Sequence, residues 1–359
     1  MKRLIVPLII FLLLVIVWLG VSSWWGDNSK AVSSSEAAVR FVIPKGRSAT
    51  QIGDKLFEER LIRNSLAFKI YVQLTGKAEK IQAGEFTLSP HHSLVEIVER
   101  LSSAPEELWV TIPEGLRREE TVERFVSSLE MSEKQALVFR EQFLIESKGQ
   151  EGFLFPDTYL FPRDVEASIV VDKMDRTFDD EFIQFRRSLL DEDTAGGLDI
   201  KGIITLASII ERETKTDEER LVVAGILFNR LEIGMALQVD AAVQYAVASE
   251  KCLPAQAGKI PTENCDWWPI LKKQDLEINS PYNTYKFTGL PPAPIANPGA
   301  SSIRAAINPE DSEYLYYIHD PEGNIHYAVS LSEHNANVKN YLGKWGLDPA
   351  PNLLCIMCT

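Results

Sequence analysis

The chain has 359 residues, of which 45% are hydrophobic and 25% are charged, which is typical of a globular protein with room for two modest domains or one large one. Its formal net charge is −14 and we find no basic run, so the sequence does not indicate a nucleic-acid-binding protein. Histidines are few, and we expect neither a metal site nor a cofactor.

The first feature along the chain is an uncharged apolar stretch, "LIVPLIIFLLLVIVWLGV", at residues 4–21. About 18 such residues are enough to span a bilayer. Lys2 and Arg3 precede it and favour a cytoplasmic N-terminus. A cleaved signal peptide is the alternative, but its apolar core is normally shorter and ends at a small-residue cleavage site. We therefore predict a single-pass anchor at 1–25 in the plasma or inner membrane, with the remaining chain outside the cytoplasm.

The next segments predict a tether and a small folded unit. Residues 26–39 are small and polar, which is typical of a linker. The range 40–109 alternates short strands with amphipathic helices, beginning with a strand at 40–43. Ser48 is the predicted N-cap of the first helix. That helix would bury Ile52 and Leu56, with Leu61 following on the same inner side.

A partial repeat marks the next boundary. "FVIPKG" at 41–46 recurs as "VTIPEG" at 110–115, and each copy leads into an amphipathic helix. We place a mixed α+β domain at 110–345 and a C-terminal tail at 346–359. Within that domain we expect a helix capped by Asp217 and ended near Gly234. The Pro-rich, Tyr-rich stretch 280–299 predicts a long irregular loop, a type of segment that often carries function.

Four cysteines lie in the C-terminal half. Cys252 and Cys265 flank a segment with Pro and Gly, which is compatible with a disulfide-closed loop that would contribute about 3 kcal/mol. Cys355 and Cys358 form a terminal C-x-x-C. Structural zinc normally takes two close pairs, and Cys252 and Cys265 are too far apart to be one, so we favour structural or incidental roles.

Two glutamates end the apolar stretch "LASIIERET" at 206–214. On a helix, Glu211 and Glu213 would each share a face with apolar residues, so periodicity does not choose between them. Side chains two positions apart point in nearly opposite directions, which excludes these two as the facing pair of an ordinary glycosidase. A carboxyl against apolar walls has a raised pKa and suits a general acid. The alternative is a helix end whose glutamates pair with Arg212, Lys215 or Arg220.

Polar and aromatic segments follow soon after this helix, at 228–246, 280–285 and 289–299. Tyr and Asn side chains suit stacking on carbohydrate and hydrogen bonding to it. Each segment could also be structural, with Asn in turns and Pro stiffening a loop. Together they indicate a groove.

Five motifs, "EGFLFPDTY", "LASIIERET", "FNRLEIGMALQVD", "SPYNTYKFTGLPPAPIANPG" and "HNANVKNYL", resemble those of the YceG-like (MltG) endolytic murein transglycosylases. The resemblance extends from the anchor to about Leu342. It implies one transmembrane helix, a LysM-like subdomain over 40–109 and an extracytoplasmic catalytic domain. It also implies cleavage of the MurNAc-β-1,4-GlcNAc bond of peptidoglycan glycan strands with formation of 1,6-anhydroMurNAc ends.

The resemblance also assigns residues. It places a single general acid/base at Glu211, a mechanism that holds no attacking water and requires no second carboxylate. Six further positions would line the groove: Asn229, Gln238, Asp240, Tyr282, Asn283 and Tyr285. Asp240 could instead cap a helix. Coupling to peptidoglycan synthases and termination of nascent strands are further implications of the family.

Two alternatives stay open. A non-catalytic wall-binding or division scaffold with the same fold would bind glycan without cleaving it. A true hydrolase would need a second carboxylate, for which Asp240 and Glu213 are the first candidates. Ala241, Ala242 and Ala293 depart from the usual family residues and leave the groove shape open.

Overall fold

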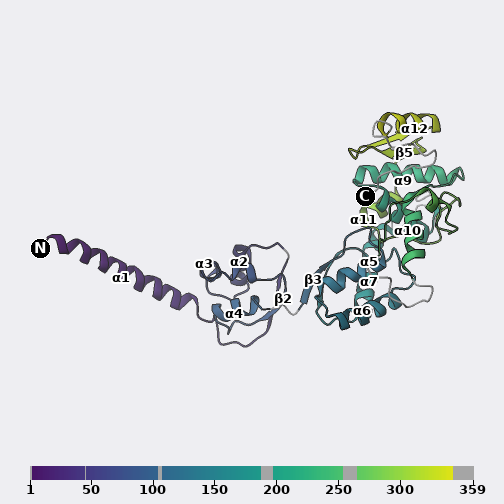
Figure 1. Cartoon of the computed structure of the whole chain (residues 1–359). Helices are drawn as coiled ribbons and strands as arrows, with labels where there is room; N and C mark the ends of the chain where they lie inside the picture. The colour runs from purple at the N-terminus through teal and green to yellow at the C-terminus, as the bar shows by residue number, and fades with distance from the viewer. Residues whose placement is uncertain (1, 45, 104–106, 187–196, 254–264, 343–359) are drawn as a thin grey trace. The chain divides into compact units, whose positions relative to one another are not determined.

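The computed structural model describes residues 2–44, 46–103, 107–186, 197–253 and 265–342, with the backbone alone at 2–10 and 184–186 (Figure 1). Cys355 and Cys358 lie outside the described residues. The chain divides into two compact units. Unit 1 comprises Met1–Val110 and Tyr159–Asp164, and unit 2 comprises Thr111–Thr158 and Val165–Thr359. Helices and strands occur in both units, which confirms the predicted α+β class.

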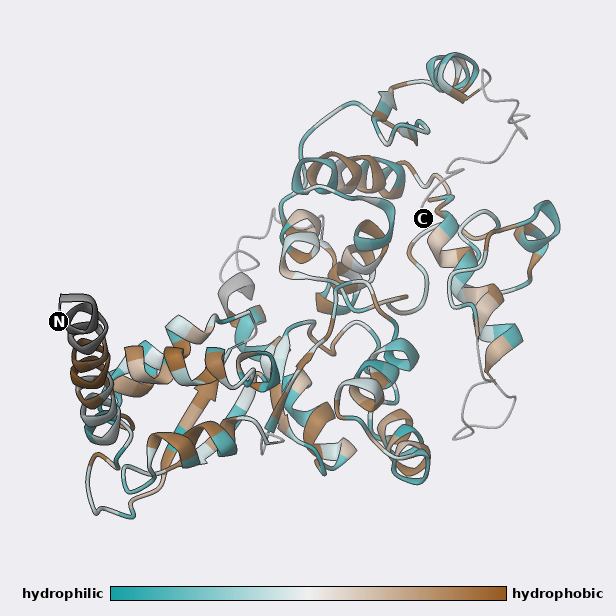
Figure 2. Ribbon diagram, turned by 60° about the vertical axis from the view of Figure 1, so that its left-hand side comes forward, coloured by the Kyte–Doolittle hydropathy of each residue, from teal (hydrophilic) through white to brown (hydrophobic). Residues whose placement is uncertain are grey.

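The N-terminal helix α1 runs from Lys2 to Asn28. Its segment Phe11–Asn28 is long and apolar enough, by length and composition, to cross a membrane, a test that a signal sequence near an N-terminus also passes. The middle of the helix is coloured as hydrophobic in Figure 2. Apolar side chains along it are exposed, such as Leu14 at 63%. By length and composition, α1 is a candidate membrane span.

Unit 1 contains a β-α-α-β arrangement, as the alternating sequence pattern predicts. Strand β1 (Val39–Ile43) pairs antiparallel with β2 (Gly84–Leu88). Between them lie α2 (Ala49–Glu58), α3 (Ser65–Leu74) and the 3-10 turn η1 (Ala78–Lys80), and α4 (Leu94–Leu101) follows β2. Ser48 caps α2 in a capping box with Gln51, which confirms the predicted N-cap. The predicted inner residues are buried: Ile52, Leu56 and Leu61.

Two further strands complete the sheet, which has the order β1-β2-β3-β4. Strand β3 (Glu107–Thr111) pairs antiparallel with β2. Strand β4 (Thr158–Pro162) comes from a later part of the chain, and Tyr159–Asp164 belongs to unit 1. This segment lies inside the range expected for the catalytic domain.

The segment expected as a linker, 26–39, makes ordered contacts within unit 1. Leu94 donates its backbone N–H to the Ser29 carbonyl at 3.0 Å, and Arg63 donates to the Ala31 carbonyl at 2.8 Å. Trp25 stacks on Tyr71 with ring centroids 5.5 Å apart. The residues that follow the apolar helix therefore pack against the folded part of unit 1.

Unit 2 is mainly helical. Helices α5 and α6 pack together, and α6 packs on α7 (Figure 1). The short strands β5 and β6 form an antiparallel hairpin. The elements of unit 2 in chain order are α5 (Arg118–Ser128), α6 (Glu133–Glu146), α7 (Ala167–Arg186), α8 (Ile200–Glu213), α9 (Asp217–Glu232), α10 (Asp240–Cys252), η4 (Lys273–Glu277), α11 (Ala300–Ile307), β5 (Tyr316–His319), β6 (Ile325–Ala328), α12 (Leu331–Asn337) and the π-turn η5 (Val338–Leu342).

Helix α8 is the centre of the main core. Its residues from Ile203 to Ile210 are all buried, so both faces of this helix are covered. Helices α9, α10 and α11 pack on it. The range 280–299 contains no helix or strand, as predicted.

The start of α9 corrects one prediction. Thr216, not Asp217, is the N-cap, because Thr216 has extended backbone angles and its side chain accepts the Glu219 N–H. Asp217 is the first helical residue and pairs with Arg220 instead. Gly234 follows the end of the helix with a φ of 67°, a conformation that glycine adopts without a steric penalty.

Candidate active site

Glu211 lies in the last turn of α8 and accepts three hydrogen bonds. The Gly299 backbone N–H and the Ser302 hydroxyl donate to Oε2 at 3.0 and 2.8 Å. Arg220 Nη2 donates to Oε1 at 3.2 Å. The Glu211 side chain is 7% exposed. These donors come from the start of α9 and the start of α11, so the packing of three helices orients one carboxylate.

Arg220 links the parts of this cluster. Besides Glu211, it donates from Nη1 to Asp217 at 2.9 Å and from Nε to the Ser302 hydroxyl at 3.1 Å. The ion pair between Glu211 and Arg220 is therefore present, as the alternative interpretation of a helix end expected. A planar guanidinium with several fixed donors holds its acceptors in a defined geometry.

A second carboxylate, Glu114, lies next to Glu211. A Cβ atom on Gly115 would stand 3.4 Å from Cγ of Glu211, and a Cβ atom on Gly299 would overlap the Glu114 carboxylate. Glu114 itself is exposed. Partial burial raises the pKa of Glu114, and the charge of Glu211 raises it further.

Glu114 is not among the residues that the sequence motifs indicated, although a signal for it is present in the sequence. It is the residue that differs between the two copies of the repeated Pro-x-Gly turn, where "IPKG" at 43–46 becomes "IPEG" at 112–115. Both turn glycines, Gly46 and Gly115, have positive φ values of 78° and 75°. The positive φ of the turn glycine thus recurs, while the residue before it changes from basic to acidic.

Glu213 points away from Glu211 into another network. It is 2% exposed and its Oε2 accepts the Tyr317 hydroxyl at 2.9 Å. The Tyr285 hydroxyl donates to Asp240 Oδ1 at 2.6 Å. Burial raises the pKa of Asp240 to about 7, although the hydrogen bond from Tyr285 opposes the shift. Asp240 and Glu213, the two candidates for a hydrolase carboxylate, are thus both buried.

The predicted groove residues fall in two places. Asp240, Gln238, Tyr282, Asn283 and Tyr285 gather where the 280–287 loop meets the start of α10. Gln238 has a φ of 50° and donates its backbone N–H to the Thr284 carbonyl at 3.0 Å. Tyr282 contacts the Tyr245 ring, with centroids 4.8 Å apart.

Asn283 and Asn229 have backbone partners. Asn283 is fully buried, and its Nδ2 donates to the carbonyls of Leu276 and Ile278. Asn229 lies apart from the others, on α9, and its Nδ2 donates to the carbonyls of Ser312 and Tyr314. Both amides therefore hold loop backbone in place.

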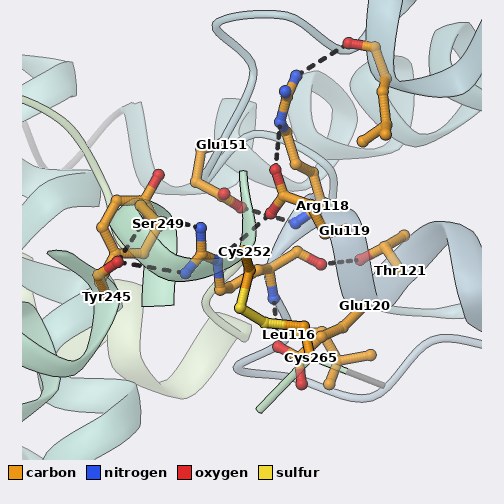
Figure 3. Close-up of polar contacts among 12 residues, drawn as sticks. Leu116, Arg118, Glu119, Glu120, Thr121, Glu151, Tyr245, Ser249, Cys252 and Cys265 are labelled. Carbon is orange, nitrogen blue, oxygen red and sulfur yellow. Dashed lines mark hydrogen bonds and ion pairs between the residues drawn. A yellow bond between two sulfur atoms is a disulfide. The ribbon is translucent and has the colours of Figure 1, made fainter. Parts of the chain in front are cut away.

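A buried charged cluster supports the loop that carries Glu114 (Figure 3). Glu151 Oε1 accepts the Arg118 backbone N–H at 3.0 Å and Asn297 Nδ2 at 3.3 Å. Burial raises the pKa of Glu151 to about 8, and the charge of Glu119 adds to the shift. Asn297 also exchanges backbone hydrogen bonds with Gly115 and Leu116, which fixes the chain that follows Glu114 relative to the loop that leads to Gly299.

The Cys252–Cys265 disulfide is formed, with Cα atoms 5.9 Å apart (Figure 3). Two tryptophans follow it. Trp267 covers the Arg117 guanidinium at 4.5 Å, and the Trp268 ring lies 3.8 Å from the Arg212 guanidinium. The disulfide therefore lies just before Trp268, whose ring covers Arg212, the residue between Glu211 and Glu213.

Metal binding finds no support in the described part of the chain, where no group of three or more His, Cys, Asp or Glu side chains is arranged to hold an ion. The groups that the described residues place around Glu211 are a second carboxyl, an arginine, a hydroxyl and the N-terminus of α11.

A family model described as YceG-like matches residues 41–340. The chain belongs to the YceG-like family. This confirms the family predicted from the five motifs. The endolytic murein transglycosylase of Bacillus subtilis is 30% identical over 332 residues, covering 86% of each chain.

A second relative and a solved structure also match. The endolytic murein transglycosylase of a Streptococcus pneumoniae serotype 2 strain is 26% identical, and the match covers 86% of this chain and 59% of the relative. The crystal structure of a YceG-like protein from Listeria monocytogenes superposes with a TM-score of 0.51 at 28% identity. That match covers 84% of this chain and 99% of the Listeria chain.

Proposed function

We propose that this YceG-like chain is an endolytic peptidoglycan lytic transglycosylase, a lyase that cuts the MurNAc-β-1,4-GlcNAc bond and leaves 1,6-anhydroMurNAc ends. Relatives in two genera carry the name endolytic murein transglycosylase. The observation that carries the proposal for the site is the carboxylate of Glu211, held by three donors at the end of a buried helix.

The reaction asks one carboxyl group to move protons. The bond between C1 of MurNAc and the glycosidic oxygen breaks, its electron pair stays on that oxygen, and the oxygen takes a proton from Glu211. The C6 hydroxyl of the same MurNAc then closes onto C1 and gives its own proton to the Glu211 carboxylate. No water molecule attacks, so the site has no need to hold one.

The residues around Glu211 orient its carboxyl group. A general acid must lie within hydrogen-bond reach of the atom that it protonates. The donors from Gly299, Ser302 and Arg220 fix both carboxylate oxygens, and the low exposure limits competing water. A fixed carboxyl requires less reorganisation at the moment of proton transfer.

The groove residues take different roles in this proposal. Gln238 and Tyr282, which are partly exposed, contact the sugar. Asn229 and Asn283 position the loops that border the groove, because their amides are occupied by backbone carbonyls. Tyr285 and Asp240 form a pair that joins the 280–287 loop to α10.

The apolar helix α1 anchors the chain in the cell membrane with a cytoplasmic N-terminus and an extracytoplasmic catalytic unit.

Unit 1 has a proposed role in binding the glycan. Its β-α-α-β arrangement is compatible with a LysM-like, glycan-binding role. We further infer that the enzyme ends nascent glycan strands beside peptidoglycan synthases. Deletion of 40–103 should weaken binding to wall sacculi; unchanged binding would refute the glycan-binding role.

The test is a digest of purified peptidoglycan by the full chain in detergent, beside Glu211→Gln and a matched Glu133→Gln control on the exposed surface of α6. Mass spectrometry should find anhydromuramyl products with the wild type and the control, and none with Glu211→Gln. Reducing ends would instead identify a hydrolase. Binding without any product would favour the scaffold alternative.

A further inference from the structure

Glu114 and Glu211 occupy one small volume at the start of α11. Gly299 supplies the contact point: its N–H binds Glu211 Oε2, and its Cα hydrogens leave the space that the Glu114 carboxylate fills. The φ of Gly299 is −79° and its ψ is 170°, angles that any residue adopts. Glycine therefore matters here for the room it leaves to the Glu114 carboxylate, which an added methyl group would displace, and not for its backbone freedom.

The backbone holds Glu114 in this position. Gly115 donates its N–H to the Asn297 carbonyl at 2.9 Å, and Asn297 donates its N–H to the Leu116 carbonyl at 2.9 Å. The Asn297 side chain also accepts the N–H groups of Gly152 and Leu154. The loop with Glu114 and the loop with Gly299 thus form one connected unit.

The charges around Glu114 are mixed. Glu211 and Asp217 favour a proton on Glu114, while Arg220 and Arg304 oppose it. Glu114 is exposed, whereas the Glu211 side chain is nearly buried. The two carboxyl groups lie close enough for the charge of Glu211 to add to the effect of burial in raising the pKa of Glu114.

We propose that Glu114 is the second proton-transfer group of the reaction, the carboxylate that accepts the proton of the C6 hydroxyl. This inference rests on the proposed function and takes the second half of the proton transfer from Glu211. A proton that rests on Glu114 first passes to Glu211, which gives it to the glycosidic oxygen as the C1–oxygen bond breaks. O6 bonds to C1, and its proton passes to Glu114. The pair then holds a proton on Glu114 again, as at the start, with no other reactant.

The structure favours Glu114 as the acceptor for two reasons. It is the more exposed of the two carboxyls and so the one open to a substrate hydroxyl. The partial burial and the neighbouring charge that raise its pKa also make its carboxylate a stronger base.

Two variants of the full chain in detergent test this role. Glu114→Gln removes the base and keeps the side-chain size. Gly299→Ala keeps both carboxyls but displaces the Glu114 carboxylate with a methyl group. We expect each to lower kcat by about 10²-fold or more with little change in KM. The double variant should be no worse than Glu114→Gln alone, because the added methyl group of Gly299→Ala acts through Glu114. Glu322→Gln, the same exchange in the exposed β5–β6 turn, is the control and should match the wild type.

The pH profile separates chemistry from structure. Wild-type kcat should rise with pH on the acid side as the fully protonated pair loses one proton, and this rise should be absent from Glu114→Gln. Wild-type kcat and an unchanged acid side in Glu114→Gln, with Glu211→Gln inactive, would overturn this inference alone. A wild-type chain that yields no anhydromuramyl product would overturn the proposed function with it.

Discussion

Glu211 and Glu213 lie two residues apart on α8 and enter separate hydrogen-bond networks. Glu211 faces Gly299, Ser302 and Arg220. Glu213 faces the Tyr317 hydroxyl and the start of α10. The helix period produces this separation, since positions two apart point in nearly opposite directions. One apolar helix end therefore supplies a carboxylate to the candidate site and another to the core.

Glu213 should behave as a structural residue. Glu213→Ala removes the acceptor of the Tyr317 hydroxyl and opens space in the core, so we expect a loss of about 1–3 kcal/mol in the free energy of unfolding. Glu213→Gln keeps the size and should retain most activity in the folded fraction. Denaturant melts and product assays on the same samples measure both effects. An inactive, well-folded Glu213→Gln beside an active Glu211→Gln would reverse the assignment.

Arg220 should matter more for rate than for folding. Its three nitrogen atoms reach Glu211, Ser302 and Asp217, and a lysine ammonium cannot hold three acceptors in that plane. We expect Arg220→Lys to lower kcat by about 10²-fold, because small misplacement of a catalytic group is costly.

The matched control for this exchange is Arg176→Lys on α7. Arg176 makes an exposed ion pair with Asp172 at 2.9 Å, and pairs of that kind contribute little. Equal kcat values for Arg220→Lys and the wild type would show that Glu211 needs no guanidinium to orient it.

Local patterns predicted much of this fold. The capping box at Ser48, the buried helix α8 and the irregular range 280–299 all follow from short-range rules of period, cap and turn. Strand β4 was harder to predict from the sequence, because its pairing with β3 joins segments that are far apart in the chain. No local pattern encodes such a partner.

The site shows the same division. The motif "LASIIERET" indicated Glu211 from the sequence alone. Arg220 was one of three basic residues that the sequence offered as ion-pair partners for its glutamates. Glu114 was missed because its place beside Glu211 depends on a tertiary contact with Gly299. Asn283 was expected in the groove, and only the structure shows that the turn around it buries the side chain.

Glu151 should make the stability of unit 2 depend on pH. Burial, with the charge of Glu119, raises its pKa to about 8, so the folded chain keeps a proton that the unfolded chain loses near the ordinary glutamate pKa of 4.5. Unfolding therefore releases a proton between these values, and stability should fall as the pH rises from about 5 to 8. Glu151→Gln should reduce this fall. Asp240, with its pKa raised to about 7, acts in the same direction and should leave a remainder.

Thermal melting midpoints at pH 5 and pH 8 measure the effect, with Glu133→Gln as a control for the loss of one exposed carboxylate. For each protein, the quantity to compare is the melting midpoint at pH 5 minus the melting midpoint at pH 8. A difference in Glu151→Gln as large as that of the wild type would mean that Glu151 is ionised in the folded chain.

The Cys252–Cys265 disulfide should stabilise unit 2 and protect the residues beside the site. The two cysteines are 13 residues apart in the chain. A disulfide that closes a loop of this size contributes about 3 kcal/mol to the free energy of unfolding. Trp268 follows this link closely in the chain, lies over Arg212 and donates its Nε1–H to Glu120 at 2.9 Å. A reductant should therefore lower the melting midpoint of the wild type and change its tryptophan fluorescence.

The matched variant replaces both cysteines, Cys252→Ser with Cys265→Ser. It should melt at the lower midpoint with or without reductant, because Cys355 and Cys358 remain in both proteins and cannot account for a difference between them. Since Arg212 separates Glu211 from Glu213, we also expect product formation to fall in the variant at temperatures where unit 2 is still folded. Identical melting of the oxidised wild type and the serine variant would mean that packing of Trp267 and Trp268 holds this segment without the covalent link.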